Sequence, residues 1–342
     1  MRVIVIDAVG SAGRAILETL AADKRIDHVV SLIRPGGAFP LADHTEVEWR
    51  EVNLSGDLSM YFRFADAVVY AGWPVRCFGD FTPNDSLQML ENVCRAVVAA
   101  GVHTFVYGSS VGVYSPAPRT DPVGEDWPTS GLPSSCLSQQ IAQNEQFVMQ
   151  FAASHEAIRA VCLRFATIIS ATTSEPPSPF ERWGMVALGR KLVSTVATGA
   201  RAAMVPSLGS HLLQVVHVGD VASAFSSALT GSVVGPFNIA SEPFTTKLVA
   251  QSFNARGVPM SPSLCSQIFS LSRRLRLHTM DPAWVDIALE SPVLDQTRAV
   301  EELGWTSRHS AASALEELAR TLAADSFKST PGKERELVLR RS

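Results

Sequence analysis

The stretch RVIVIDAVGSAGRAILETL, residues 2–20, decides the fold. Its first five residues are mostly β-branched and apolar, which predicts a short strand buried on both faces. A turn of small residues follows, and apolar side chains then recur at helical spacing from Ala15 to Leu20. The stretch therefore predicts a strand, a tight turn and a helix.

The same alternation continues along the chain. Further strands are expected over residues 27–33, 47–52, 67–70, 104–107 and 159–164, and helices over residues 87–100 and 138–154. Strands that alternate with helices are typical of a parallel sheet with helices on both faces. The sequence therefore predicts an α/β protein with a doubly wound parallel sheet.

Beyond Thr167 the pattern loosens into Pro- and Ser-rich sequence and short apolar runs, which indicates a second, smaller lobe. We expect the main domain over residues 1–168, a C-terminal lobe mainly over residues 169–325, and a flexible tail over residues 326–342. Two segments near residues 212–242, namely 214–218 and 235–239, are expected to return to the main sheet.

Composition excludes several classes of function. The net charge of −4 and the pI near 6.1 argue against nucleic acid as a partner. The five cysteines form no C-x-x-C pair, which argues against a disulfide framework and a structural zinc site, and no metal is expected. No apolar run reaches about 18 residues, and the first strand begins at Arg2 without a signal-like segment before it. A cytoplasmic protein with no membrane segment is the expectation.

An ordered set of motifs points to a known family. The chain carries DAVVYAGWP (66–74), FVYGSSVGVY (105–114), LR (163–164), VVHVGDVA (215–222), FNIA (237–240) and ELGW (302–305). Over roughly residues 1–322 this set resembles the extended short-chain dehydrogenase/reductase family, the NAD-dependent epimerase/dehydratase group. The resemblance implies a Rossmann-type domain that binds a dinucleotide at the carboxyl ends of its strands, and a C-terminal lobe that closes over a small substrate. It also implies a homodimer formed through the helices at 87–100 and 138–154.

The expected cofactor turn departs from the family pattern. The family reads Thr-Gly-x-x-Gly-x-x-Gly, and the last two glycines match Gly10 and Gly13 here, with Ser11 and Ala12 between them. Asp7 replaces the first glycine. A carboxylate about 5 Å from a phosphate costs on the order of 3 kcal/mol at an effective dielectric near 20, roughly a hundredfold in affinity. Dinucleotide binding is therefore expected to be weakened or absent, unless Asp7 turns away and only caps the helix.

The ribose contacts differ as well. Ile33 stands where the family commonly has an acidic residue for the adenine ribose, and Arg34 follows it. Arg34 could pair with a 2′-phosphate, which would favour NADP, or could be a solvated arginine. Asn53 stands near the expected adenine position, and the cofactor contacts are completed by Ala71 and Gly72.

The largest departure concerns catalysis. Family members carry Tyr-x-x-x-Lys on the long helix, where the lysine lowers the pKa of the tyrosine that moves the proton. Here the tyrosine position is Cys136 or Leu137 and the lysine position is Gln140 or Ile141, depending on a one-residue choice of register. Neither register restores the pair, so the usual proton relay is not expected to operate.

Substitute site residues can still be named. The candidate catalytic residues are Ser110, which matches the family's active-site serine, Cys136 near a helix start, Tyr114 and His217. The candidate substrate contacts are Trp73, Pro74, Asp126, Arg164, Phe180 and Trp183. Each has a structural alternative: a buried thiol, a packed histidine or aromatic side chain, or a turn carboxylate.

Three hypotheses remain open. The first is an enzyme without the relay that catalyses a cyclisation, isomerisation, elimination or hydrolysis on a small, fairly apolar substrate in specialised biosynthesis. The second is an NADP-dependent reductase or epimerase with substitute catalytic residues. The third is a noncatalytic relative that acts as a binding or partner protein.

Overall fold

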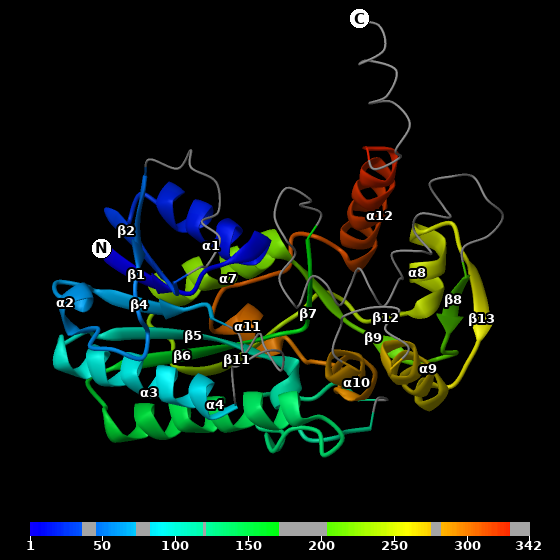
Figure 1. Ribbon diagram of the computed structural model, residues 1–342, viewed down its shortest axis with the longest axis horizontal. Helices are drawn as coiled ribbons and strands as arrows, with labels where there is room; N and C mark the ends of the chain where they lie inside the picture. The colour runs from blue at the N-terminus through cyan, green and yellow to red at the C-terminus, as the bar shows by residue number, and fades with distance from the viewer. Residues whose placement is uncertain (36–45, 73–82, 119–120, 171–203, 275–281, 329–342) are drawn as a thin grey trace, which may run out of the picture.

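The computed structural model describes residues 1–342 except 36–45, 73–82, 119–120, 171–203, 275–281 and 329–342 (Figure 1). Its centre is a seven-stranded sheet in the order β11-β6-β5-β4-β1-β2-β3. The strands are β1 (Arg2–Ile6), β2 (His28–Ile33), β3 (Val47–Glu51), β4 (Ala67–Tyr70), β5 (Thr104–Ser110), β6 (Arg159–Phe165) and β11 (Gly235–Ile239). Every pairing in this sheet is parallel, which confirms the expected α/β class.

Helices cover both faces of the sheet (Figure 1). α1 (Gly10–Ala22) and α7 (Val218–Thr230) lie side by side on one face, and α3 (Pro83–Ala99) and α4 (Cys136–Ser154) on the other. The short helix α2 (Ser59–Phe62) packs beside α3, and the 3₁₀ turn η1 (Val111–Val113) follows β5. β1 and β4 carry apolar side chains toward both helical layers, as expected for a sheet buried on both faces.

The C-terminal lobe lies beside the carboxyl ends of β5 and β6 (Figure 1). It contains three two-stranded sheets, which pair β7 (Thr167–Ile169) with β10 (Val215–His217), β8 (Met204–Ser207) with β13 (Arg256–Pro259), and β9 (Leu212–Leu213) with β12 (Phe244–Thr245). Its helices are α8 (Thr246–Ser252), α9 (Pro262–Arg274), α10 (Pro282–Glu290) and α12 (Ala311–Lys328), while α11 (Thr297–Glu301) packs against β11.

Two expectations about the later segments need correction. Residues 235–239 do join the main sheet, as β11 beside β6, but Val215–His217 pairs with β7 in a separate sheet. A short apolar run specifies a strand without specifying its partner, and Ala166 turns the chain away between β6 and β7. The expected tail also begins too early, because α12 continues to Lys328.

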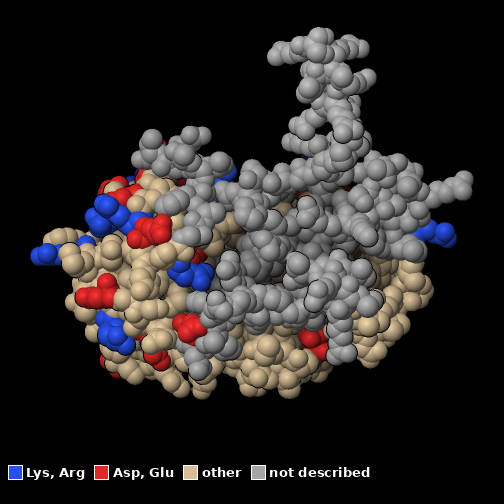
Figure 2. All heavy atoms as spheres, viewed as in Figure 1, with Lys and Arg blue, Asp and Glu red and all other residues tan. Residues whose placement is uncertain are grey.

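Charges of both signs lie intermixed on the described surface visible in Figure 2, mostly at the end of the molecule formed by the main domain. Nothing in the described residues of that view forms a large field of one sign. Among the described residues, no helix is long and apolar enough to span a bilayer.

Candidate functional site

The turn between β1 and α1 keeps the glycines that packing requires. Gly10 has φ of 71°, in the left-handed region that favours glycine. A Cβ on Gly13 would lie 2.2 Å from the carbonyl carbon of Ala8, so any larger residue there would force the helix away from the turn. Asp7 has φ of 55°, which aspartate tolerates better than most residues. Gly10 and Gly13 therefore allow the tight turn and the close seating of α1 against it, with Asp7 in a left-handed conformation before them.

Asp7 does not turn away into solvent, because it forms an ion pair with Arg34. The Asp7 side chain is 5% exposed, and its two oxygens accept from Nε and Nη2 of Arg34 at 3.1 and 2.6 Å. Burial alone would lower the pKa of Arg34, but the attraction of Asp7 and its hydrogen bonds outweigh burial and raise that pKa. The charge of each partner is therefore neutralised within the protein.

The pair lies over the ends of three neighbouring strands. Asp7 follows β1, Arg34 follows β2, and Gly72 follows β4 two residues after Tyr70. A Cβ on Gly72 would lie 2.9 Å from Cβ and 3.1 Å from Oδ2 of Asp7. Burial raises the pKa of Tyr70, and the Asp7 carboxylate adds to that increase. The carboxylate therefore occupies the opening between the ends of β1 and β4.

The other expected cofactor residues have separate surroundings. The Ser11 hydroxyl is buried and has no hydrogen-bond partner among the described residues, whereas Ala12 packs in the core. Ala71 is buried, and its N–H donates to the carbonyl of Ile6 at 3.0 Å. Asn53 is exposed, and its Oδ1 accepts from the N–H of Ser55 at 3.0 Å, which closes a local turn.

The start of α4 contains both possible registers of the lost relay. Cys136 is exposed, Leu137 and Ile141 are 1% and 2% exposed, and Gln140 is buried. Ser138, which lies between Leu137 and Gln140 in the sequence, links α4 to η1 because its hydroxyl donates to the carbonyl of Gly112. The two aliphatic side chains therefore belong to the core, and the thiol lies at its edge.

Helix α10 covers this part of α4. A Cβ on Gly112 would lie 3.2 Å from the Cδ1 atoms of both Ile141 and Ile287, so these side chains meet over η1. Ser134 Oγ also donates to Glu290 Oε2 at 2.8 Å at the far end of α10. In the register of Leu137 and Ile141, an aliphatic layer therefore lies at the expected phenol and ammonium positions, and in the other register an exposed thiol and a buried amide lie there.

Tyr114 belongs to a buried polar network. Its hydroxyl accepts from Arg164 Nη1 at 2.7 Å and donates to Asn238 Oδ1 at 2.6 Å. Arg164 also donates to Glu145 Oε1 from Nη2 at 2.6 Å and from Nε at 2.9 Å, and Ser109 Oγ donates to the other Glu145 oxygen. Burial raises the pKa of Tyr114 to about 12. Tyr114 and Arg164 thus link β5, α4, β6 and β11, and both are almost fully buried.

Ser110 and Asp126 each lie in surroundings of their own, separate from the network around Tyr114. Ser110 is 1% exposed, and its Oγ accepts from the N–H of Gly112 at 3.2 Å as the cap of η1. Asp126 is exposed beside a shallow surface hollow that it shares with Arg298. The expected substrate contacts Trp73, Pro74, Phe180 and Trp183 lie outside the described residues.

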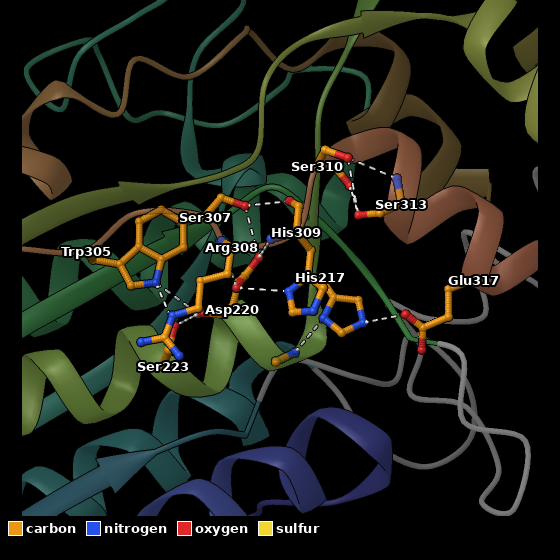
Figure 3. A network of polar contacts seen from close by, with 11 residues as sticks. His217, Asp220, Ser223, Trp305, Ser307, Arg308, His309, Ser310, Ser313 and Glu317 are labelled. Carbon is orange, nitrogen blue, oxygen red and sulfur yellow. Dashed lines mark hydrogen bonds and ion pairs between the residues drawn. The ribbon is translucent and has the colours of Figure 1, made fainter.

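His217 lies in a second network, at the start of α7 (Figure 3). Its Nδ1 accepts from the N–H of Gly219 at 3.1 Å, and its Nε2 lies 3.3 Å from Glu317 Oε2 on α12. The ring of His309 stacks on it with centroids 3.8 Å apart, and His309 Nδ1 lies 3.2 Å from Asp220 Oδ1. Burial, and then His309, lower the pKa of His217. Its neutral ring therefore caps α7 and faces α12.

Asp220 anchors the loop that carries His309 (Figure 3). Its carboxylate is 1% exposed and accepts from the N–H groups of Arg308 and His309 and from the hydroxyl of Ser307, at 3.0 to 3.1 Å. The network therefore holds α7, the loop after Trp305 and α12 together.

An apolar cavity of about 110 Å³ lies inside the C-terminal lobe. Its walls come from strands β7, β8, β9, β10 and β12 and helices α8, α9, α10 and α12, and they include Ile169, Phe244, Val249, Phe269, Val285 and Leu315. A narrower crevice shares Thr167, Leu213, Gln214 and Ala288 with it and reaches Val111 at the end of β5. Ser291 lines the crevice, and its buried hydroxyl has no hydrogen-bond partner among the described residues.

Sequence reasoning missed three parts of this arrangement. Asp7 and Arg34 directly follow β1 and β2, which are adjacent parallel strands. An acidic and a basic residue directly after two neighbouring strands were therefore the available signal for this ion pair. Glu145 was the one acidic residue of a long helix whose other polar side chains are neutral. The cavity had no sequence signal, because its walls come from separate elements of the lobe.

The family is established by comparison. The model of the NAD dependent epimerase/dehydratase family matches residues 3–240, and the chain belongs to this family. No curated protein matches the sequence.

Solved structures share the fold at low identity. The UDP-glucose 4-epimerase of Thermus thermophilus, solved with NAD, is 19% identical with a TM-score of 0.68, over 94% of this chain and 99% of its own. The UDP-glucose 4-epimerase of Thermotoga maritima, solved with UDP-glucose, is 15% identical with a TM-score of 0.69, over 95% and 99%. That of Bifidobacterium longum, solved with NAD+ and UDP, is 15% identical with a TM-score of 0.67, over 93% and 97%.

Proposed function

We propose that this chain is an atypical enzyme of its family that catalyses a non-redox step, a cyclisation, isomerisation, elimination or hydrolysis, on a small apolar substrate. The observation that carries the proposal is the aliphatic layer at the start of α4. Leu137 and Ile141 are buried there, Ile141 meets Ile287 over η1, and among the described residues of that layer no side chain supplies the phenol or the ammonium group of the family.

The other tyrosines offer no substitute. The chain has four, at positions 61, 70, 107 and 114. Tyr70 and Tyr107 are buried in the core layer between the sheet and helices α3 and α4, and Tyr61 lies on the short helix α2. Burial raises the pKa of both buried phenols, which opposes a proton-transfer role. The Tyr114 hydroxyl already makes two hydrogen bonds, and its pKa is raised to about 12. A reductase with a replacement phenol therefore has less support than a non-redox enzyme.

The cavity in the C-terminal lobe supports the substrate class. Its described walls contain no charged side chain, so a charged nucleotide or sugar phosphate would be desolvated there without compensation. The Ser291 hydroxyl at the crevice offers one hydrogen bond to a ligand whose apolar part fills the cavity. A small aromatic ring with one hydroxyl group has the matching chemistry, because a cavity lined by apolar side chains binds apolar rings such as benzene.

Ligand-observed NMR with 4-methylphenol and toluene tests the substrate class. We expect both probes to bind the wild type. Ser291→Ala should weaken the binding of 4-methylphenol about 2- to 10-fold, the value of one hydrogen bond, and should leave the binding of toluene unchanged. Val249→Phe, which fills the cavity wall, should weaken both. Equal binding of both probes by wild type and Val249→Phe would contradict the proposal.

A separate assay tests the absence of redox chemistry. Purified protein is incubated with NADPH or NADH and a panel of small ketones and aldehydes, and the absorbance of the reduced nicotinamide is followed. No turnover is expected. Steady oxidation of either cofactor with a carbonyl substrate would overturn the non-redox proposal and favour the reductase.

A further inference from the structure

The site of this inference is the point where the strand order of the main sheet reverses. The chain passes from β1 to β2 and β3 on one side and returns to β4 on the other side of β1. In open α/β sheets, ligands bind outside the carboxyl ends of the strands at such a point. Asp7 directly follows β1, and Gly72 comes two residues after the end of β4 at this point.

We propose that the Asp7–Arg34 ion pair is a built-in plug, in which an internal carboxylate takes the place of a ligand anion and closes the opening to nicotinamide dinucleotides. The first argument is space. A Cβ added to Gly72 would lie 3.1 Å from Oδ2 of Asp7, so the Asp7 carboxylate approaches the backbone of Gly72 closely and takes up the space between these strand ends. A glycine at position 7 would remove the whole side chain and leave the turn unchanged, because φ of 55° suits glycine better than aspartate.

The second argument is charge. Arg34 follows the neighbouring strand and is a cation that could receive a phosphate, but its Nε and Nη2 already donate to the two oxygens of Asp7. A ligand anion would have to displace a carboxylate bound in the two-point geometry that guanidinium groups bind best. If it did displace the carboxylate, Asp7 would be left without its cation beside the ligand, and the two negative charges would repel each other. The dinucleotide therefore does not fit these residues while the pair is intact.

The third argument is what lies under the plug. Gly10 and Gly13 keep the close approach of the turn, and α1 still presents its N-terminal N–H groups. The Ser11 hydroxyl in the first turn of α1 is 96% buried without a partner among the described residues. The backbone groups that could bind an anion are thus retained, so removal of the Asp7 side chain should restore anion binding.

Isothermal titration calorimetry with ADP-ribose 2′-phosphate and with ADP-ribose measures the effect directly. These probes carry the pyrophosphate without the nicotinamide, so binding is read independently of any redox activity. We expect no saturable heat for the wild type up to about 1 mM, and a gain of roughly 100-fold or more for Asp7→Gly. Asp7→Asn, which removes the charge but keeps the volume, should give a smaller gain.

The role of Arg34 has its own variant. In Asp7→Gly, freed Arg34 should make the 2′-phosphorylated probe bind more tightly than ADP-ribose, and Asp7→Gly with Arg34→Ala should lose that preference. Wild-type binding as tight as that of Asp7→Gly would overturn the plug. The plug would also be overturned if neither Asp7→Gly nor Asp7→Asn gained affinity for the probes while both variants still unfolded cooperatively on heating. Probe binding by the wild type without cofactor oxidation would sink the plug and leave the proposed non-redox function intact.

Discussion

At the scale of single residues, several residues that the sequence presents as site candidates stabilise the fold instead. Tyr114 and Arg164, which the sequence presents as site candidates, serve instead as the centre of a buried network with Glu145. Both partners of the Arg164–Glu145 pair have side chains less than 5% exposed, so each charge depends on the other. The network explains why an arginine lies inside a β-strand of the core.

Arg164→Met tests this assignment. The substitution leaves the Glu145 carboxylate buried without its cation, which should lower the free energy of unfolding by about 3–5 kcal/mol. Urea unfolding followed by circular dichroism measures it. Arg50→Met, which breaks an exposed pair with Glu48, is the matched control and should change stability by less than about 1 kcal/mol. A loss as small as the control's would show that the network does not carry the structural weight assigned to it.

Single residues also mark the limit of sequence reasoning. The departures at Asp7 and on the relay helix could be read directly from the chain. Their consequence could not, because Arg34 reaches Asp7 only when β1 and β2 lie side by side, and Leu137 is closed off only when α10 covers it. Contacts between distant elements decided both cases.

At the scale of elements, two helices and a loop meet at His217. Its neutral ring accepts the N–H of Gly219, and the titratable groups around it are His309 on the loop, Asp220 on α7 and Glu317 on α12. Because the pKa of His217 is lowered in the folded protein, the unfolded chain takes up this proton first as the pH falls. Stability contributed by the neutral ring is therefore complete above the ordinary histidine pKa of about 6.5 and declines below it.

Comparison of His217→Asn with the wild type isolates this effect. Asparagine can still cap α7 through its side-chain oxygen but does not titrate. We expect the wild type to lose stability to urea between pH 7.5 and pH 5.5, and the variant to lose less over the same interval. Parallel pH profiles for the two proteins would assign the acid sensitivity to other groups.

The elements themselves were largely predictable for the main sheet and poorly so for the lobe. Most strands of the sheet are short apolar runs of four to seven residues bounded by turns, and several are followed by a helix, so local sequence carries their signal. The lobe is built from strands of two to four residues whose partners come from distant segments. Residues 215–217 have the same apolar character as a strand of the main sheet, and only their pairing with β7 places them elsewhere.

At the scale of the whole molecule, the expected homodimer through α3 and α4 remains a proposal. The exposed row of α4 supports it, because it consists of Gln139, Gln143, Gln146 and Gln150 and carries no charge. Two such neutral rows can pack against each other without the cost of burying ions.

Light scattering during gel filtration tests the dimer. The wild type should elute with the mass of two chains, and Gln143→Glu with Gln146→Glu should shift it toward one chain, because like charges would meet across the twofold axis. Ser232→Glu, on an exposed turn beyond α7, is the control and should leave the mass unchanged. A wild-type mass of one chain would contradict the proposal.

The tight approach of Gly13 to Ala8 bears on how such chains are recognised at all. That glycine is demanded by the seating of a helix on a strand, a requirement that holds whether or not any nucleotide arrives. A match to the later glycines of the motif can therefore report how the helix packs without reporting whether a nucleotide binds. The position that bears on nucleotide binding is the first glycine of the motif, and in this chain that position is Asp7.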